Sequence, residues 1–521
     1  MDDTDIFFWI VLIPTLSTFL TALIKHRSSA QGWSVISAVI VFVLILGRIQ
    51  HDSRVIYLGL GLWALLVVLP GVLSTLYNTA LLQQNYPRAY RLARVISILH
   101  PFDGWREQPK IIQALDLAYK GDVGRAVGIL KQFQRVVSPA AHTAMINLYR
   151  ITNQWEEFLE WVEQLPADVS MNASFVPVLL RAKAEVGDVL GMIDLYDRNR
   201  DVIPKLAPTV NRDFCRLVLF AFSGRRDLVQ RLFSGPLQLL PNATKQFWIA
   251  TADLTAGQTK TGLENLNAQL HSADPNTRRA IERRLSKPLP SAAILDRAHL
   301  QVIEEAAREQ GHEEVFHAAP PLFSGATRAT QLLIAANLLM FAVEVYCGGA
   351  TNGDVLMRLG ALYPPAVRSG EWWRLGASLF LHFGALHVVM NMIGLWALGP
   401  FVENAFGFFR YLIVYLGAGI GSMWIVMKIG SGPHSHQVTV GASGCIMGLV
   451  GATGGMMIKG WLLDRAAPAK QRLRAVLTIL AMQTIFDAMI PQISMTAHLS
   501  GAFFGFVIAL LLPNKLGRQR T

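Results

Sequence analysis

The chain has 521 residues, of which 52% are hydrophobic and only 16% are charged, and its formal net charge is +11. Soluble domains carry about 25% charged residues, so this composition excludes an ordinary soluble, disordered or fibrous protein and indicates a membrane protein. We attribute the positive charge to Lys and Arg retained in cytoplasmic loops, and we expect no nucleic-acid binding. Three cysteines, Cys215, Cys347 and Cys445, lie too far apart to predict a disulfide framework or a cysteine zinc site.

Three apolar segments open the sequence, near residues 6–24, 34–47 and 55–77. The first and third are long enough to cross a hydrocarbon core of about 30 Å, and the second is marginal. Lys25 and Arg27 follow the first segment, and a cluster of arginines follows the third: Arg88, Arg91 and Arg94. Because basic residues stay on the cytoplasmic side, we predict an outside start, three transmembrane helices within residues 1–80, and a cytoplasmic continuation.

Residues 81–325 contain no membrane-crossing run, but a helix–turn–helix pattern recurs in them. The turns are centred 33 or 37 residues apart, on Gly121, Gln154, Gly187, Gly224 and Gly257. A unit of this length resembles the tetratricopeptide repeat, whose stacked helices form a concave surface that binds peptides or proteins. We therefore expect a cytoplasmic helical-repeat domain with a possible protein partner, and an irregular helical bundle is the alternative.

A basic stretch follows the repeats, and it comprises Arg278, Arg279, Arg283, Arg284 and Lys287. We expect these side chains to form a solvated face or to rest on anionic lipid headgroups. The membrane segments resume soon afterwards, which is the reason for considering the lipid contact.

Six further apolar runs lie near residues 330–346, 379–398, 411–429, 439–458, 474–490 and 495–512. With the repeat domain in the cytoplasm, an even number of spans brings the basic loop between Lys459 and Arg474 and the basic tail to the cytoplasmic side. We therefore expect an all-α, multi-pass protein of a bacterial plasma membrane, with a third domain over residues 326–521.

Four polar side chains stand out within these six runs, namely His387, Asn391, Ser443 and His498. Burying an unpaired polar group in hydrocarbon is costly, so such residues are expected to be functional. His387 and Asn391 are four residues apart, which places them on one face of a helix.

Ser443 and His498 each begin a stripe of small residues. Gly448, Gly451 and Gly455 continue the face that starts near Ser443, and His498 shares a face with Gly501 and Gly505. Small residues let helices approach closely, so the two stripes are expected to pack and to bring hydroxyl and imidazole within hydrogen-bond reach. In the predicted topology both segments enter from the outer side, which places the two residues at a similar depth.

Five motifs, in this order, resemble the rhomboid intramembrane serine proteases over residues 326–514: Glu371-Trp372-Trp373-Arg374, His382-x4-His387-x3-Asn391, Gly399-x3-Glu403, Gly441-Ala442-Ser443-Gly444 and Ala497-His498-x2-Gly501-x3-Gly505. The resemblance implies a bundle of six transmembrane helices in which Ser443 is the nucleophile and His498 its general base. It implies a dyad without a carboxylate as third member.

The resemblance also implies roles for the remaining motif residues. The backbone N–H of Ser443 and the side chains of His387 and Asn391 would form the oxyanion hole. The structural residues would be Glu371, Trp373, Arg374, His382, Glu403, Gly441, Gly444, Gly501 and Gly505. One departure is Met447, where many rhomboids carry an aromatic residue on which the catalytic histidine stacks.

The function implied by this resemblance is a serine endopeptidase that cleaves transmembrane proteins near the outer membrane face, with no metal or other cofactor. The alternative is a catalytically inactive rhomboid-like protein that binds membrane clients. A transporter would need charged residues along a pathway, and these spans have few. An aspartyl protease would need two facing carboxylates, and the sequence offers no evident partner for Asp487.

Overall fold

The computed structural model describes residues 3–24, 31–134, 138–170, 172–206, 208–317, 327–429, 438–464, 467–489 and 494–514. Within these ranges the protein is helical throughout, apart from loops and one isolated antiparallel bridge between Leu362 and Thr439. The chain divides into two compact units, Met1–Arg308 and Glu309–Thr521. The predicted boundaries at residues 80 and 325 stay predictions.

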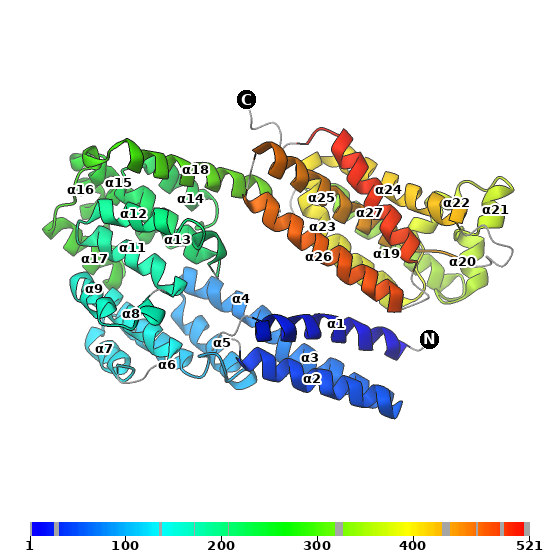
Figure 1. Ribbon diagram of the computed structural model, residues 1–521, viewed down its shortest axis with the longest axis horizontal. Coiled ribbons are helices and arrows are strands. Elements are labelled where there is room, and N and C mark those ends of the chain that lie inside the picture. Colours follow the sequence, from blue (N-terminus) through cyan, green and yellow to red (C-terminus); the bar gives the residue numbers. More distant parts are fainter. Residues whose placement is uncertain are drawn as a thin grey trace. The chain divides into compact units, whose positions relative to one another are not determined.

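The first unit opens with the three predicted apolar segments, each of which is helical (Figure 1). They form α1 (Asp3–Ile24), α2 (Gln31–Gln50), α3 (Ser53–Trp63) and α4 (Leu69–Leu82). A π-helical turn, Ala64–Val68, joins α3 to α4. The second segment was predicted as residues 34–47 and is longer in the structure, because polar residues at both of its ends continue the helix.

These helices bury a small apolar core and expose large apolar side chains on their other faces. The core contains Phe8, Val11, Ile36, Ile40, Leu44 and Ile56. Phe42 and Ile49 on α2 are 66% and 70% exposed. An exposed surface of this kind is suited to lipid.

The rest of this unit is built from helix pairs. The helices are α5 (Tyr86–Leu99), α6 (Gln108–Tyr119), α7 (Val123–Lys131), α8 (Pro139–Thr152), α9 (Trp155–Glu163), α10 (Ala167–Ser170), α11 (Val176–Glu185), α12 (Val189–Arg198), α13 (Val210–Phe222), α14 (Arg226–Ser234), α15 (Asn242–Thr255), α16 (Thr259–Gln269) and α17 (Pro275–Ser286). Helix α18 (Arg297–His317) follows and crosses the boundary between the two units.

All five predicted turns separate two helices of this series. Each turn holds one residue in the left-handed region: Gly121, Asn153, Gly187, Gly224 and Gly257. Glycine and asparagine adopt this conformation at little cost, which is why they end helices. Asp122 and Asp188 then cap the second helix of their pairs by accepting hydrogen bonds from backbone N–H groups. The helix–turn–helix units are thus present, and their membership of the tetratricopeptide family stays a prediction.

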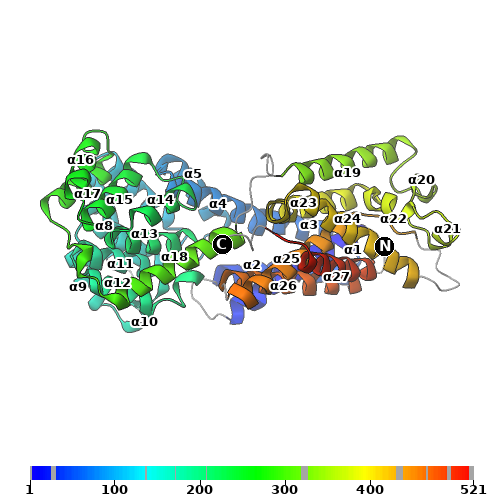
Figure 2. The same cartoon turned by 90° about the horizontal axis from the view of Figure 1, so that it is seen from above.

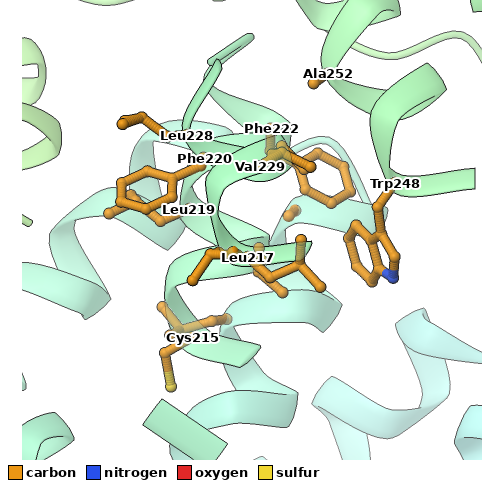
Figure 3. Close-up of a cluster of buried hydrophobic side chains, with 14 of the residues drawn as sticks. Cys215, Leu217, Leu219, Phe220, Phe222, Leu228, Val229, Trp248 and Ala252 are labelled. Atoms are coloured by element: carbon orange, nitrogen blue, oxygen red, sulfur yellow. The ribbon is translucent and has the colours of Figure 1, made fainter. Parts of the chain in front are cut away.

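The helix α13 lies at the centre of the largest apolar core of this unit (Figure 3). Its residues from Cys215 to Phe222 are all buried, and Leu228, Val229 and Trp248 from the next helices pack around them. A helical segment in which eight consecutive residues are buried must be enclosed by neighbours. Helices stacked on both sides of α13 provide this enclosure.

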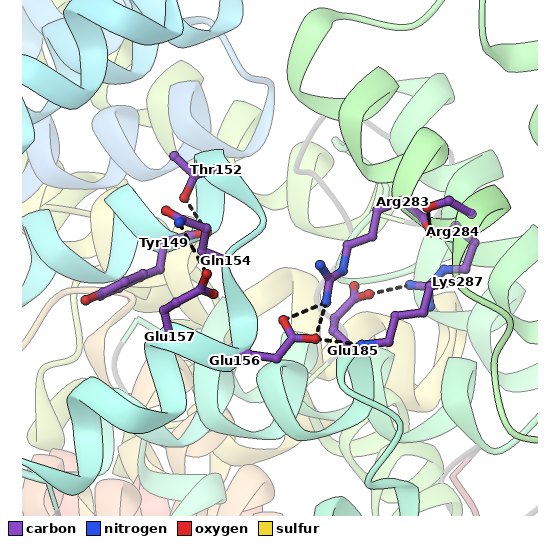
Figure 4. Close-up of polar contacts among 10 residues, drawn as sticks. Tyr149, Thr152, Gln154, Glu156, Glu157, Glu185, Arg283, Arg284 and Lys287 are labelled. Carbon is purple, nitrogen blue, oxygen red and sulfur yellow. Dashed lines mark hydrogen bonds and ion pairs between the residues drawn. The ribbon is translucent and has the colours of Figure 1, made fainter.

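Three members of the basic stretch after the repeats form ion pairs within the protein, and the expectation of a solvated or lipid-bound face is wrong for Arg284, which is buried. Lys287 Nζ and Arg283 Nη2 lie 2.6 and 2.9 Å from the Glu156 carboxylate (Figure 4). Arg284 pairs with Glu185 at 3.0 Å. Burial would raise the pKa of Glu156, but hydrogen bonds from Lys287 and Arg283 lower it to about 2.

Residues 274–290 therefore contact several helix pairs, and we call this segment the strap. Their first helical residue, Pro275, faces the turn at Gly121, and Pro290 faces the turn at Gly187. The guanidinium of Arg284 also stacks on Phe222 and Phe247, with 4.9 and 5.4 Å to the ring centroids. The strap thus connects helix pairs that are far apart in sequence.

The second unit contains the six predicted C-terminal runs. The long helices are α19 (Arg328–Tyr346), α23 (Ala385–Phe406), α24 (Phe408–Ile429), α25 (Ser443–Asp464), α26 (Ala467–Met489) and α27 (Met495–Leu511). Between α19 and α23 lie three short helices, α20 (Gly353–Leu359), α21 (Pro364–Arg368) and α22 (Arg374–Ala377). The helices α23, α24, α25 and α27 lie side by side in both views (Figure 1 and Figure 2).

One predicted run begins too early. The apolar stretch from residue 379 was assigned to a membrane helix, but Ser378–Phe380 form a 3-10 turn and α23 starts only at Ala385. Gly384, with φ of 88°, precedes the helix and interrupts the run. Hydropathy alone does not separate an apolar loop from an apolar helix.

Among the described residues, six helical segments are long and apolar enough to cross a membrane: Gly32–Gln50, Ser53–Leu82, Arg328–Tyr346, Ala385–Phe406, Phe408–Ile429 and Ser443–Leu462. Two shorter apolar helices are Phe7–Leu20 and Met495–Leu511. The helix α26 carries Lys470, Arg472 and Arg474 near its start, which shortens its apolar part. These helices make the chain a multi-pass membrane protein.

Candidate active site

The helices α25 and α27 pack through their two glycine stripes, as the sequence predicts. A Cβ added at Gly501 would overlap the carbonyl oxygen of Gly444, and one at Gly505 would overlap that of Gly448. Because contacts at later residues of α25 pair with later residues of α27, the two helices run parallel. Glycine is required here since any side chain would hold the backbones apart.

This packing brings the first turns of α25 and α27 together. Ser443 is the first residue of α25, and His498 is the fourth of α27. A Cβ on Gly444, the neighbour of Ser443, would lie 3.6 Å from the carbonyl oxygen of Ala497, the neighbour of His498. The half-buried Ser443 and the buried His498 therefore occupy facing helix starts.

Two backbone contacts hold the segment before Ser443. Thr439 exchanges both of its backbone hydrogen bonds with Leu362, at 3.0 Å each, and the N–H of Gly441 donates to the carbonyl of Ser378 at 2.9 Å. Gly441 has φ of 127°, which a residue with a side chain rarely adopts. The chain therefore enters α25 from a defined direction.

His387 and Asn391, one turn apart on α23, both face this segment. A Cβ on Gly441 would lie 2.8 Å from His387 Nε2 and 3.6 Å from Asn391 Nδ2. The backbone N–H of Phe383 donates to His387 Nδ1 at 3.3 Å, so the proton of a neutral ring resides on Nε2, which becomes a donor. The buried Nδ2 of Asn391 has no hydrogen-bond partner among the described residues. Two donors thus converge beside the residue that precedes Ala442 and Ser443.

His382 lies in the loop before α23 and not on the helix itself. Its backbone N–H donates to the buried Glu344 carboxylate at 2.9 Å, and its ring contacts the His387 ring edge-on at 5.2 Å between centroids. The predicted run from residue 379 would have placed both histidines on one continuous helix, with His382 off the face that carries His387, and this is wrong because α23 starts at Ala385. The ring of His382 supports that of His387.

His498 has a carboxylate partner that the sequence did not reveal. Its Nδ1 lies 2.7 Å from Oδ2 of Asp487 near the end of α26, and both side chains are buried. Gln483, one turn earlier on α26, donates to the other oxygen of Asp487 at 2.7 Å. The sequence offered no second carboxylate for Asp487, and in the structure its partner is an imidazole from the next helix. The two residues are 11 positions apart and lie on different helices, so no helical periodicity predicts their contact.

Arg374 connects several parts of the segment between α19 and α23. Its Nε donates to Glu371 at 2.7 Å, and its Nη1 donates to the carbonyls of Met357 and Ala361 at 2.7 and 3.1 Å. Its guanidinium also lies over the ring of Trp373, 4.9 Å from the centroid. These contacts connect α20 with α22. They therefore fix the position of the chain next to the Leu362–Thr439 bridge.

Glu403, near the end of α23, caps the start of α19. Its carboxylate accepts hydrogen bonds from the N–H groups of Ala329 and Thr330 at 2.7 and 2.8 Å, and from the Thr330 hydroxyl at 2.7 Å. A carboxylate at a helix N-terminus satisfies orphan donors and interacts favourably with the helix dipole. Met447, the departure noted in the sequence, is buried in a cluster with Val450, Val476 and Ala502.

Comparisons with known proteins match this part of the chain. A family model described as the Rhomboid domain matches residues 369–515. The putative rhomboid protease YdcA of Bacillus subtilis is 32% identical over 159 residues, which are 30% of this chain and 75% of that protein. The chain belongs to the rhomboid family. Two further relatives of this rhomboid are the rhomboid protease GluP of Bacillus subtilis, 31% identical over 211 residues, and the rhomboid protease AarA of Providencia stuartii, 26% identical over 215 residues.

The matched region of this rhomboid is limited. The GluP match covers 40% of this chain and 39% of GluP, and the AarA match covers 37% and 76%. The chain thus spans about two fifths of GluP, and the RHOMBOID-like protein 5 of Arabidopsis thaliana is covered to 50%. Every motif from Glu371 to Gly505 lies inside the region that the family model matches.

Proposed function

We propose that this rhomboid is an intramembrane serine endopeptidase. Ser443 attacks the scissile carbonyl, and His498 accepts the hydroxyl proton and later delivers it to the leaving amine. Water then resolves the acyl-enzyme with the same histidine as base. The observation that carries this proposal is the parallel packing of α25 and α27, which places the two residues at facing helix starts. Family membership supports it, since the names of several relatives describe them as proteases.

Within this proposal, the oxyanion that forms on the substrate carbonyl is bound by three donors. They are the backbone N–H of Ser443, the ring Nε2–H of His387 and the side-chain amide of Asn391. The unpaired Asn391 Nδ2 supports this role, because a buried donor without a partner costs about 1–3 kcal/mol unless an acceptor arrives. A substrate oxyanion is such an acceptor, and donors already in place stabilise it without reorganisation.

The proposed substrates are transmembrane proteins, cleaved near the outer membrane face in the predicted topology. The site needs no cofactor in this mechanism, since nucleophile, base and oxyanion donors are side-chain and backbone groups. The helices α25 and α27 both begin at one end of the bundle, which supports a site close to the membrane surface. Water reaches a shallow site more easily than the bilayer centre, and hydrolysis requires water.

A fluorophosphonate probe tests the nucleophile directly. We expect the probe to label the wild-type protein in membranes and not to label Ser443→Ala, because the reagent forms a covalent bond only with an activated serine hydroxyl. Labelling is measured by gel fluorescence against the amount of folded protein. Absent labelling of the folded wild-type protein would instead favour the alternative, an inactive rhomboid-like protein that binds membrane clients.

For the helix pairs of the first unit we propose a cytoplasmic adaptor role, in which they bind a protein partner. The row of stacked pairs supports this role. A partner would bind to those parts of the helix pairs that residues 274–290 do not cover. We expect deletion of residues 100–280 to remove co-purifying protein while the membrane helices remain. Unchanged co-purification would contradict the adaptor proposal.

A further inference from the structure

A buried carboxylate among the helices of the second unit requires an explanation, and Asp487 is such a group. It is 4% exposed near the end of α26, and His498 is 5% exposed on α27. An ionised carboxylate buried without a partner is strongly destabilising in an apolar environment. Asp487 has such a partner, because its Oδ2 lies 2.7 Å from the ring Nδ1 of His498.

We propose that Asp487 is a positioning residue for the general base and extends the expected serine–histidine pair to a triad. This inference rests on the proposed function of Ser443 and His498 and adds a third member to it. By accepting a hydrogen bond from Nδ1–H, the carboxylate fixes the neutral ring in the tautomer whose Nε2 has a free lone pair. Only this tautomer can take a proton from a serine hydroxyl.

The second oxygen of Asp487 is held as well. Gln483 donates its amide to Oδ1 at 2.7 Å, while the same amide nitrogen lies 3.4 Å from His498 Nδ1. Since the contact with Asp487 is the shorter of the two, Gln483 donates its hydrogen bond to Oδ1 of Asp487. The other oxygen, Oδ2, is left to accept from the imidazole. Gln483 and Asp487 are one turn apart on the same face of α26, which limits rotation of the carboxylate.

One proton moves during the proposed reaction, from Ser443 to His498 and then to the leaving amine. As the Ser443 Oγ–carbon bond forms, the hydroxyl proton moves to His498 Nε2, and the imidazole becomes an imidazolium. Asp487 keeps its negative charge and stabilises that cation without taking the proton. When the scissile C–N bond breaks, the same proton passes from Nε2 to the leaving amine nitrogen.

His387 on α23 is a second imidazole that interacts electrostatically with His498. It is a neutral donor in the arrangement described above, since its Nδ1 accepts from Phe383. Asp487 is therefore the group that compensates the positive charge developing on His498. Met447, which replaces an aromatic residue, cannot supply such compensation because a thioether carries no charge.

The experiment compares Asp487→Asn and Asp487→Glu with the wild type in cleavage of a tagged single-span substrate in proteoliposomes. In Asp487→Asn the introduced amide would donate to Nδ1 of His498 and so stabilise the wrong tautomer, and we expect kcat to fall by about 10²–10⁴-fold. KM should change less than about 2-fold, because Asp487 does not contact substrate. Asp487→Glu keeps the charge and should recover part of kcat.

Glu403→Gln is the matched control, since it removes a buried carboxylate from the same unit without touching His498. It should lower the Tm and leave the kcat of the folded protein near the wild-type value. The inference is overturned if Asp487→Asn keeps wild-type kcat, or if Glu403→Gln loses kcat as strongly as Asp487→Asn does. Failure of the proposed function has a different signature, which is cleavage that persists in Ser443→Ala.

Discussion

Replacing Ser443 with alanine should reduce cleavage of a single-span membrane substrate by about 10⁴-fold or more. In the proposed mechanism the Ser443 hydroxyl is the protein group that forms a covalent bond with the scissile carbonyl, and alanine leaves the backbone donor of the oxyanion hole in place. The measurement is product formation from a tagged substrate, at equal amounts of folded enzyme. Because the change is small and Ser443 starts α25, we expect the Tm to move little.

Ser500→Ala is the control for this experiment. Ser500 lies on α27, two residues after His498, and its hydroxyl donates to the carbonyl of Thr496 in its own helix. The hydroxyl is therefore used within the helix and is absent from the proposed chemistry, and we expect wild-type turnover. Undiminished cleavage by Ser443→Ala would rule out Ser443 as the nucleophile.

Replacing Gly505 with alanine should destabilise the membrane bundle by about 1–3 kcal/mol. The new Cβ would overlap the carbonyl oxygen of Gly448, so α25 and α27 must separate by a fraction of an ångström or more. For a unit of about 200 residues this corresponds to a Tm lower by roughly 3–10 °C. Since the same contact aligns Ser443 with His498, probe labelling should fall together with the Tm.

Gly454→Ala provides the matched comparison. A Cβ at Gly454 of α25 would lie 3.4 Å from Val476 Cγ1, an ordinary contact distance, and alanine favours the helix over glycine by about 1 kcal/mol. This variant should keep or raise the Tm. Equal effects of the two substitutions would mean that the close approach at Gly505 does not limit stability.

Much of the fold was predictable because its signals are local. Apolar runs of about 20 residues indicate membrane helices, and Gly or Asn between two apolar helical patterns indicates the turns between helix pairs. One error, the start of α23, arose where an apolar loop continues directly into an apolar helix. The pairing of Arg283 and Lys287 with Glu156 was also missed, since it joins residues more than 120 positions apart.

The same distinction between local and long-range signals applies to the candidate site. Sequence alone determined which helix face carries His387 and Asn391, and which two segments begin with Ser443 and His498 beside glycines, because helical periodicity relates residues within one segment. Only the tertiary structure decided that Asp487 meets His498 and that His382 supports His387 from a loop. Those contacts depend on how helix ends and loops are placed in space, and residue spacing does not encode that placement.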